Sequence, residues 1–148
     1  MTSSQTPFLQ LENIDVHYGA VQALFDVNLT VQKGEVGSVL GGNASGKSTT
    51  LKSVLGLVSP SKGRIILEGR EIQGLLSPDV IDLGVASVPE GRRVFPEMSV
   101  YENLLMGAYP RRHEKEAIER DLHEVFTSFP RLAERRRQAA GTLSGGEQ

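Results

Sequence analysis

The sequence predicts an α/β or α+β fold, and three observations lead to that prediction. Strand-like segments come early in the chain, they alternate with segments of helical spacing, and glycines crowd between one strand-like segment and the helix-like segment after it. Alternation of this kind is typical of a sheet covered by helices. The chain shows no internal repeat, so repeat architectures are not expected.

The first part of the chain carries the strand signals. After a lead of residues 1–7 that is expected to be disordered, apolar and polar residues alternate partly at period two, which is typical of strands. Turn pairs such as Tyr18-Gly19 and Lys33-Gly34 separate the apolar stretches. The expected strands are 9–16, 23–31, 35–40, 64–67 and a segment within 79–89.

Helical spacing follows the glycines and then dominates the second part of the chain. Ser99 and Glu102 have the S-x-x-E spacing of a capping box, which predicts a helix that begins there. Pro130 is expected to end the last helix, because proline cannot continue a helical ladder. The expected helices are 48–57, 99–108 and 113–128.

The bulk composition narrows the class of protein. With 39% hydrophobic and 23% charged residues, the chain resembles an ordinary soluble domain. A formal net charge of −2 gives no basic field for nucleic acid. Cysteine is absent, no stretch approaches the roughly 20 apolar residues that span a bilayer, and the N-terminus lacks signal-peptide features. A cytoplasmic protein is expected, and any membrane contact should come through a partner.

A glycine-rich loop carries the sharpest chemical signal. It matches the pattern G-x-x-x-x-G-K-[ST], in which backbone N–H groups and a helix N-terminus surround a polyphosphate. Lys47 should reach the β- and γ-phosphates of ATP, the Ser48 hydroxyl should bind Mg²⁺, and Thr49 should add a phosphate contact. The bland alternative is an ordinary glycine-rich turn before a helix. The candidate residues are Gly41, Gly42, Asn43, Ala44, Ser45, Gly46, Lys47, Ser48 and Thr49.

A second glycine-rich motif lies at residues 143–148, LSGGEQ. Ser144 and Glu147 have capping-box spacing, so the motif could simply begin a helix. Its N–H groups and serine hydroxyl could equally form a second anion site. The motif taken by itself leaves both interpretations open.

Together the two motifs resemble ABC-transporter ATPases, and the resemblance covers residues 8–148. It implies an ABC-type P-loop NTPase domain of the α/β class. An N-terminal antiparallel β subdomain and an incomplete RecA-like core would occupy about 8–90. A helical subdomain that ends in the signature motif would occupy about 91–148.

The resemblance also assigns roles to further residues. The signature motif would bind the γ-phosphate of ATP held by a second ATP-binding subunit in a head-to-tail dimer, using Ser144, Gly145, Gly146 and Glu147. Tyr18 matches the aromatic position that stacks on adenine. Glu90 stands where most members carry a glutamine that touches Mg²⁺, so Ser48 and Glu90 are the candidate metal ligands.

The segment from Val88 to Leu104 looks like the shorter ATP-binding subunit of branched-chain amino acid importers. The partners implied are integral-membrane permease subunits, which would hold the chain peripherally at the inner face of the membrane. Arg92 and Arg93 fall in the segment that would face the permease. The cluster Arg135–Arg137 is interpreted as a solvated charged face.

Three departures from the family pattern shape the expectations. The chain ends at Gln148, before the positions where the family places its Walker B Asp, catalytic Glu and switch His, so residues 1–148 are expected not to hydrolyse ATP alone and to be marginally stable. Ala44 and Gly37 depart from the usual loop glycine and strand residue, which predicts weaker nucleotide binding. The alternatives are a short module that binds nucleotide without turnover and a non-transport ABC ATPase.

Overall fold

The computed structural model describes residues 6–91 and 93–148, in two compact units, Met1–Ser87 and Val88–Gln148. Each unit has buried apolar residues of its own, and the two are described separately. The expected disordered lead falls mainly on residues outside the described ranges.

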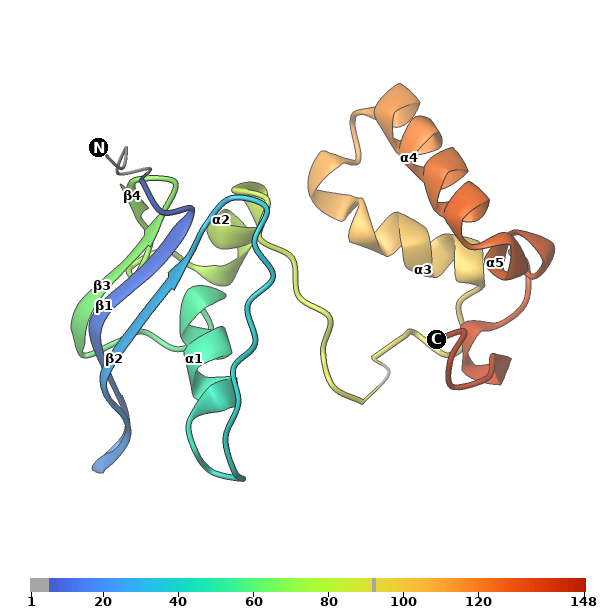
Figure 1. The fold of residues 1–148 in the computed structure, drawn as a ribbon. Coiled ribbons are helices and arrows are strands. Elements are labelled where there is room, and N and C mark those ends of the chain that lie inside the picture. The colour runs from blue at the N-terminus through green and yellow to red at the C-terminus, as the bar shows by residue number, and fades with distance from the viewer. Residues whose placement is uncertain (1–5, 92) are drawn as a thin grey trace. The chain divides into compact units, whose positions relative to one another are not determined.

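An antiparallel sheet forms the first unit (Figure 1). Strand β1 (Leu9–Tyr18) forms a hairpin with β2 (Val21–Val31), in which Tyr18 lies opposite Val21. On its other edge β1 pairs with β3 (Lys62–Leu67), and β3 pairs with the short β4 (Arg70–Glu71). The strand order β2-β1-β3-β4 confirms the expected strands at 9–16, 23–31 and 64–67.

A β-bulge in β1 brings its backbone very close to β3. The pairing of the two strands shifts register after Glu12, and Asn13 adopts a left-handed conformation with φ 51. Gly63, with φ 88, faces this bulge, and a Cβ atom there would overlap the carbonyl oxygens of Glu12 and Asn13. Only glycine fits both the backbone conformation and the space.

Two helices cover one face of the sheet (Figure 1). Helix α1 (Lys47–Val54) contributes Val54 to the core, and α2 (Ser77–Asp82) contributes Val80. The fully or nearly fully buried members of this core are Leu11, Ile14, Val16, Leu24, Ile65, Leu67 and Ile72. Alternate residues of β1 and β3 point inward, as strand periodicity requires.

Two of the expected strands are wrong. Residues 35–40 are irregular, with the side chains of Val36 and Leu40 94% and 89% exposed. The segment 79–89 begins in α2, where Pro78 favours a helix start, and continues as irregular chain to Val88. A strand needs a hydrogen-bonded neighbour, and no described segment pairs with either stretch.

Helices build the second unit. Helix α3 (Val100–Gly107) begins at the predicted capping box, in which Ser99 and Glu102 exchange bonds. The 3₁₀ turn η1 (Tyr109–Arg111) leads to α4 (Lys115–Ser128). Pro130 follows the end of α4 as expected, but it also begins α5 (Pro130–Glu134), because proline fits the first turn of a helix.

A small apolar core holds these helices together, and the 3₁₀ turn η2 (Ala140–Thr142) closes the unit. The buried members are Val100, Ile118, Leu122, Ala140 and Leu143. Across the described residues of both units, no helix combines the length and the apolar character that a membrane span requires.

Candidate nucleotide-binding site

The glycine-rich loop lies where the sequence places it, at the N-terminal end of α1 (Figure 1). Gly46 is the residue before the helix and has φ 89. A Cβ atom there would lie 2.5 Å from Leu24 Cδ2 and 3.3 Å from the Ala23 carbonyl oxygen. Glycine therefore lets the loop and the helix N-terminus approach β2 closely.

The side chain of Lys47 forms hydrogen bonds with the backbone of the loop that precedes it. Its Nζ donates to the carbonyl oxygens of Gly41, at 2.8 Å, and Gly42, at 2.6 Å, and lies 3.4 Å from Ser45 Oγ. The Ser45 N–H also donates to the Gly42 carbonyl, at 3.3 Å. The ammonium group thus stays at the bend, where its charge and the helix N-terminus both favour an anion.

The hydroxyl groups of Ser48 and Thr50, both in the first turn of α1, have different surroundings. Ser48 is exposed on this turn, so a metal ion can reach its hydroxyl. Thr49 is half-buried and its carbonyl accepts from Ser53 Oγ at 3.0 Å, while Thr50 Oγ1 donates to the Gly46 carbonyl at 3.1 Å. A serine at position 48 fits an Mg²⁺ ion that is also bound by phosphate oxygens.

Ala44 adopts the left-handed conformation, with φ 64. A Cβ atom costs on the order of 1 kcal/mol in this region, and glycine removes that cost. ATP would hold Ala44 in this conformation, whereas the free loop can leave it, so we expect Ala44→Gly to tighten ATP binding about fivefold, since 1.4 kcal/mol corresponds to tenfold. The measurement is the dissociation constant of a fluorescent ATP analogue.

The matched control for that substitution is Ala86→Gly, which removes the same methyl group from an exposed residue outside the loop. An unchanged dissociation constant in Ala44→Gly, or an equal gain in Ala86→Gly, would contradict the argument from backbone strain.

Tyr18 lies at the end of β1 with 45% of its surface exposed. It faces Val21 across the hairpin, and Gly46 approaches β2 at Ala23 and Leu24, a few residues further along. Tyr18 and the phosphate loop therefore lie at the same end of the β1–β2 hairpin. The stacking of Tyr18 on adenine stays a prediction.

The signature motif forms a turn in the second unit, and the Gln148 N–H donates to the Ser144 carbonyl oxygen at 3.1 Å, as at the start of a helix. Glu147 Oε2 accepts from the Ser144 N–H at 3.0 Å and from Ser144 Oγ at 2.7 Å. The Glu147 N–H bonds the Ser144 carbonyl oxygen at 3.1 Å, so the reciprocal bond to the hydroxyl is not made. Both serine donors thus already bind an anion, the carboxylate of the same turn.

Arg135 was not expected at this turn, and it lies against it. Its Nη1 donates to Glu147 Oε2 at 3.3 Å, whereas Arg136 and Arg137 are exposed, so only Arg135 departs from the interpretation of this cluster as a solvated face. Nothing in the local sequence signals this contact, since the two residues lie on different elements. The Ser144 hydroxyl and N–H, and then Arg135, hold the pKa of Glu147 below its ordinary value.

This pKa shift predicts how the turn responds to pH. The pKa of Glu147 is lower in the folded than in the unfolded chain. The ionised Glu147 carboxylate therefore stabilises the folded turn fully above the unfolded pKa, and this stabilisation is lost as pH falls through the folded pKa. We expect Ser144→Ala to raise the pKa of Glu147 toward its ordinary value, as followed by NMR titration of the Glu147 carboxyl carbon.

The α3 cap provides a crossed control. Ser99 lowers the pKa of Glu102 by the same pair of bonds, from its hydroxyl and its backbone N–H. Ser144→Ala should leave the pKa of Glu102 unchanged, and Ser99→Ala should shift Glu102 alone. If Glu147 kept its low pKa in Ser144→Ala, the backbone N–H of residue 144 and Arg135 would account for it without the hydroxyl.

Glu90 lies in the exposed irregular segment at the start of the second unit, next to Gly91 with φ 83. Its neighbour Arg93 is exposed as well, and Arg92 lies outside the described residues. Glu90 and the signature turn thus belong to one unit, and Tyr18 and the phosphate loop to the other. The role of Glu90 as a metal ligand stays a prediction.

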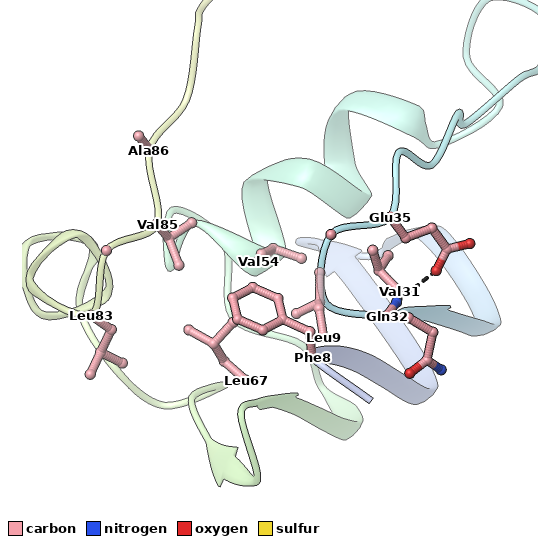
Figure 2. A pocket seen from close by; sticks show the side chains of 12 residues that line it. Phe8, Leu9, Val31, Gln32, Glu35, Val54, Leu67, Leu83, Val85 and Ala86 are labelled. Carbon is pink, nitrogen blue, oxygen red and sulfur yellow. Dashed lines mark hydrogen bonds between the residues drawn. The ribbon is translucent and has the colours of Figure 1, made fainter. Parts of the chain in front are cut away.

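A cavity of about 340 Å³, which no sequence pattern predicted, lies at the end of the sheet in the first unit (Figure 2). Phe8 lies beside Leu67 and Val54 in it, and Glu35 at its rim accepts the Gln32 N–H at 2.6 Å. Its lining contains no basic side chain, so it is unsuited to a polyphosphate. The glycine-rich loop therefore stays the candidate nucleotide site.

Comparison with known proteins shows to which family the chain belongs. The family model described as "ABC transporter" matches residues 24–148, from within β2 to the signature turn. The chain belongs to the ABC transporter family.

Two similar relatives of this ABC family come from Pseudomonas aeruginosa. The high-affinity branched-chain amino acid transport ATP-binding protein BraG is 43% identical over 95% of this chain, and its counterpart BraF is 32% identical over 96%. The ribose import ATP-binding protein RbsA 2 of Streptomyces avermitilis is 41% identical over 72% of the chain. The chain spans 59% of the length of BraG, 61% of BraF and 21% of RbsA 2.

Solved ABC-family structures confirm the predicted fold class. A nucleotide-free ATP-binding cassette from an ABC transporter matches with a TM-score of 0.79 at 28% identity, over 96% of this chain and 61% of that one. An ADP-bound conformation of an ATP-binding cassette matches with the same TM-score and identity, over 97% and 61%. The antiparallel sheet and the helical unit are thus parts of an ABC-type P-loop NTPase domain.

Proposed function

We propose that this chain is the ATP-binding part of an ABC importer for branched-chain amino acids. One observation carries the nucleotide assignment: Lys47 and the glycine loop lie together at the N-terminus of α1. Lys47 and the loop N–H groups would hold the phosphates, and Ser48 would hold Mg²⁺, which neutralises phosphate charge when bound. Tyr18, at the same end of the hairpin, would stack on the base.

The signature turn would act in a second subunit's site. Ser144 already donates both its N–H and its hydroxyl to a carboxylate, which is the donor set that a γ-phosphate needs. A head-to-tail pair of chains would place this turn against the phosphate loop of its partner, in a two-fold interface.

The proposed cargo rests on the relatives. BraG and BraF, named for branched-chain amino acid transport, match over nearly the whole of this chain, whereas the ribose relative matches over less of it. The cargo itself would be selected by permease subunits, which would bind the chain at the inner face of the membrane. No nucleic acid partner is proposed, in keeping with the net charge of −2.

Uptake by cells tests the cargo. Cells from which the gene has been deleted should lose uptake of radiolabelled leucine, isoleucine and valine, and should keep uptake of ribose and arabinose. Reintroducing the gene should restore the first set. Loss of sugar uptake with intact leucine uptake would assign the chain to a sugar importer instead.

A further inference from the structure

The side chain of Asn103 binds the loop that precedes its own helix. From α3, its Oδ1 accepts the Phe95 N–H at 2.8 Å, and its Nδ2 lies 3.1 Å from the Phe95 carbonyl oxygen. Nδ2 also lies 3.3 Å from the Met98 carbonyl oxygen and 2.9 Å from that of Ser99. One half-buried carboxamide thus holds the backbone of residues 95–99 at both ends.

This loop pairs in turn with the segment that leads into the signature turn. The N–H groups of Ala140 and Gly141 donate to the carbonyl oxygens of Met98, at 2.9 Å, and Pro96, at 3.0 Å. The N–H groups of residues 100 and 101 donate back to the carbonyls of residues 138 and 136, each at 3.0 Å. Four backbone bonds therefore join 96–101 to 136–141 in an antiparallel arrangement.

Close contact keeps these two segments in register. A Cβ atom on Gly141 would lie 2.8 Å from Pro96 Cβ and 3.2 Å from the Pro96 carbonyl oxygen. The segment then continues into the signature turn, where Gln148 Nε2 donates to the carbonyls of Ala140 and Leu143, each at 3.1 Å. The position of the turn thus depends on the position of the loop at 95–99.

We infer that Asn103 is a positioning residue for the signature turn. It fixes the loop at 95–99, the loop fixes residues 140–141 by backbone pairing, and these carry the turn at Ser144. Among the described residues Asn103 makes no side-chain hydrogen bond to the turn, so it would act on nucleotide only through the loop at 95–99 and the turn. The inference rests on the proposed function of the turn as the phosphate contact for a second subunit.

The chemistry explains why an amide is needed at this position. Phe95 presents an N–H and a carbonyl oxygen to one side chain, and a side-chain amide carries an acceptor oxygen and an NH₂ donor on separate atoms that can bind both. A carboxylate at position 103 would keep the acceptor for the Phe95 N–H, but it would face three carbonyl oxygens without a donor. Asn103→Asp should therefore keep the bond from the Phe95 N–H and lose the bonds that Nδ2 donates.

Amide hydrogen exchange of the whole chain tests the inference. Asn103→Ala should raise the exchange of the Ala140 and Gly141 amides about tenfold, although Asn103 touches neither, because local opening follows the loss of supporting bonds. Asn103→Asp should raise the same two amides while the Phe95 amide stays protected. Met106→Ala, which removes an exposed side chain from the same helix, should change none of them.

Two results would overturn the inference. The first is unchanged exchange at Ala140 and Gly141 in Asn103→Asp. The second is an equal rise in the amides of α4, since this would mean that Asn103 only holds the unit together. Asn103→Asp also decides the matter if Asn103→Ala does not fold.

Nucleotide measurements separate this inference from the proposed function. With Mg²⁺ and ATP, Asn103→Asp should bind a fluorescent ATP analogue as the parent chain does, within about twofold, and should self-associate about tenfold more weakly. If the parent chain bound no ATP, the proposed function would fail, and the exchange data would still report on Asn103. If self-association were unchanged, Asn103 would not position the turn for a second subunit.

Discussion

Replacing Lys47 by alanine is expected to weaken ATP binding between about tenfold and a hundredfold. Hydrogen bonds to charged groups contribute about 1.5–3 kcal/mol, and 1.4 kcal/mol corresponds to tenfold in a dissociation constant. Lys47 also holds the carbonyl oxygens of Gly41 and Gly42, so its loss relaxes the loop as well as removing a charge. The measurement is titration of the chain with a fluorescent ATP analogue in Mg²⁺ buffer.

Lys52 provides the matched control, because it is an exposed lysine in the last turn of the same helix. Lys52→Ala removes the same side chain and the same charge, and it should change the dissociation constant by less than about twofold, as expected of an isolated surface charge. Equal affinities of the two variants would mean that the loop is not the nucleotide site. The proposed function would then lose its main support.

Replacing Gly63 by alanine is expected to destabilise the first unit by about 3 kcal/mol or more. The left-handed conformation of Gly63, φ 88, accounts for about 1–2 kcal/mol of this. The rest comes from overlap of the new Cβ atom with the carbonyl oxygens of Glu12 and Asn13. These are backbone atoms of paired strands, so neither can move without loss of the β1–β3 pairing.

Gly69→Ala is the control that measures the cost of the backbone conformation without the overlap of a Cβ atom. Gly69 has φ 81, close to that of Gly63, but a Cβ atom there would meet nothing within 4 Å. Gly69→Ala should therefore cost only about 1–2 kcal/mol, the price of the backbone conformation alone. Urea unfolding followed by circular dichroism measures both, and equal losses would show that the space around Gly63 is not limiting.

Much of the fold follows from local patterns in the sequence. The Tyr18-Gly19 turn pair predicted the break between β1 and β2, and the spacing of Ser99 and Glu102 predicted the start of α3. Residues 35–40 failed as a strand for a physical reason. Their composition fits a strand, but a strand forms only beside a partner, and the described chain supplies none.

The candidate site also contains some features that the sequence predicts and others that it does not. The loop pattern locates Lys47 and Ser48 correctly at the start of α1, because glycine spacing encodes backbone conformation directly. The contact of Arg135 with Glu147 and the four bonds of Asn103 were not predictable, since each depends on how separate segments pack. Ala44 is the intermediate case, in which a single unexpected residue pointed to the strained φ that the structure has.

The bond between Glu147 and Ser144 has a further consequence for reversibility. Because the N–H and hydroxyl of Ser144 are already bonded to Glu147, these two donors are satisfied before any phosphate binds. A phosphate that bound to the turn would replace the Glu147 carboxylate at Ser144. The net free energy of its binding would be the difference between two similar interactions. Contacts of that kind would release as readily as they form, which would suit the proposed head-to-tail pair of subunits.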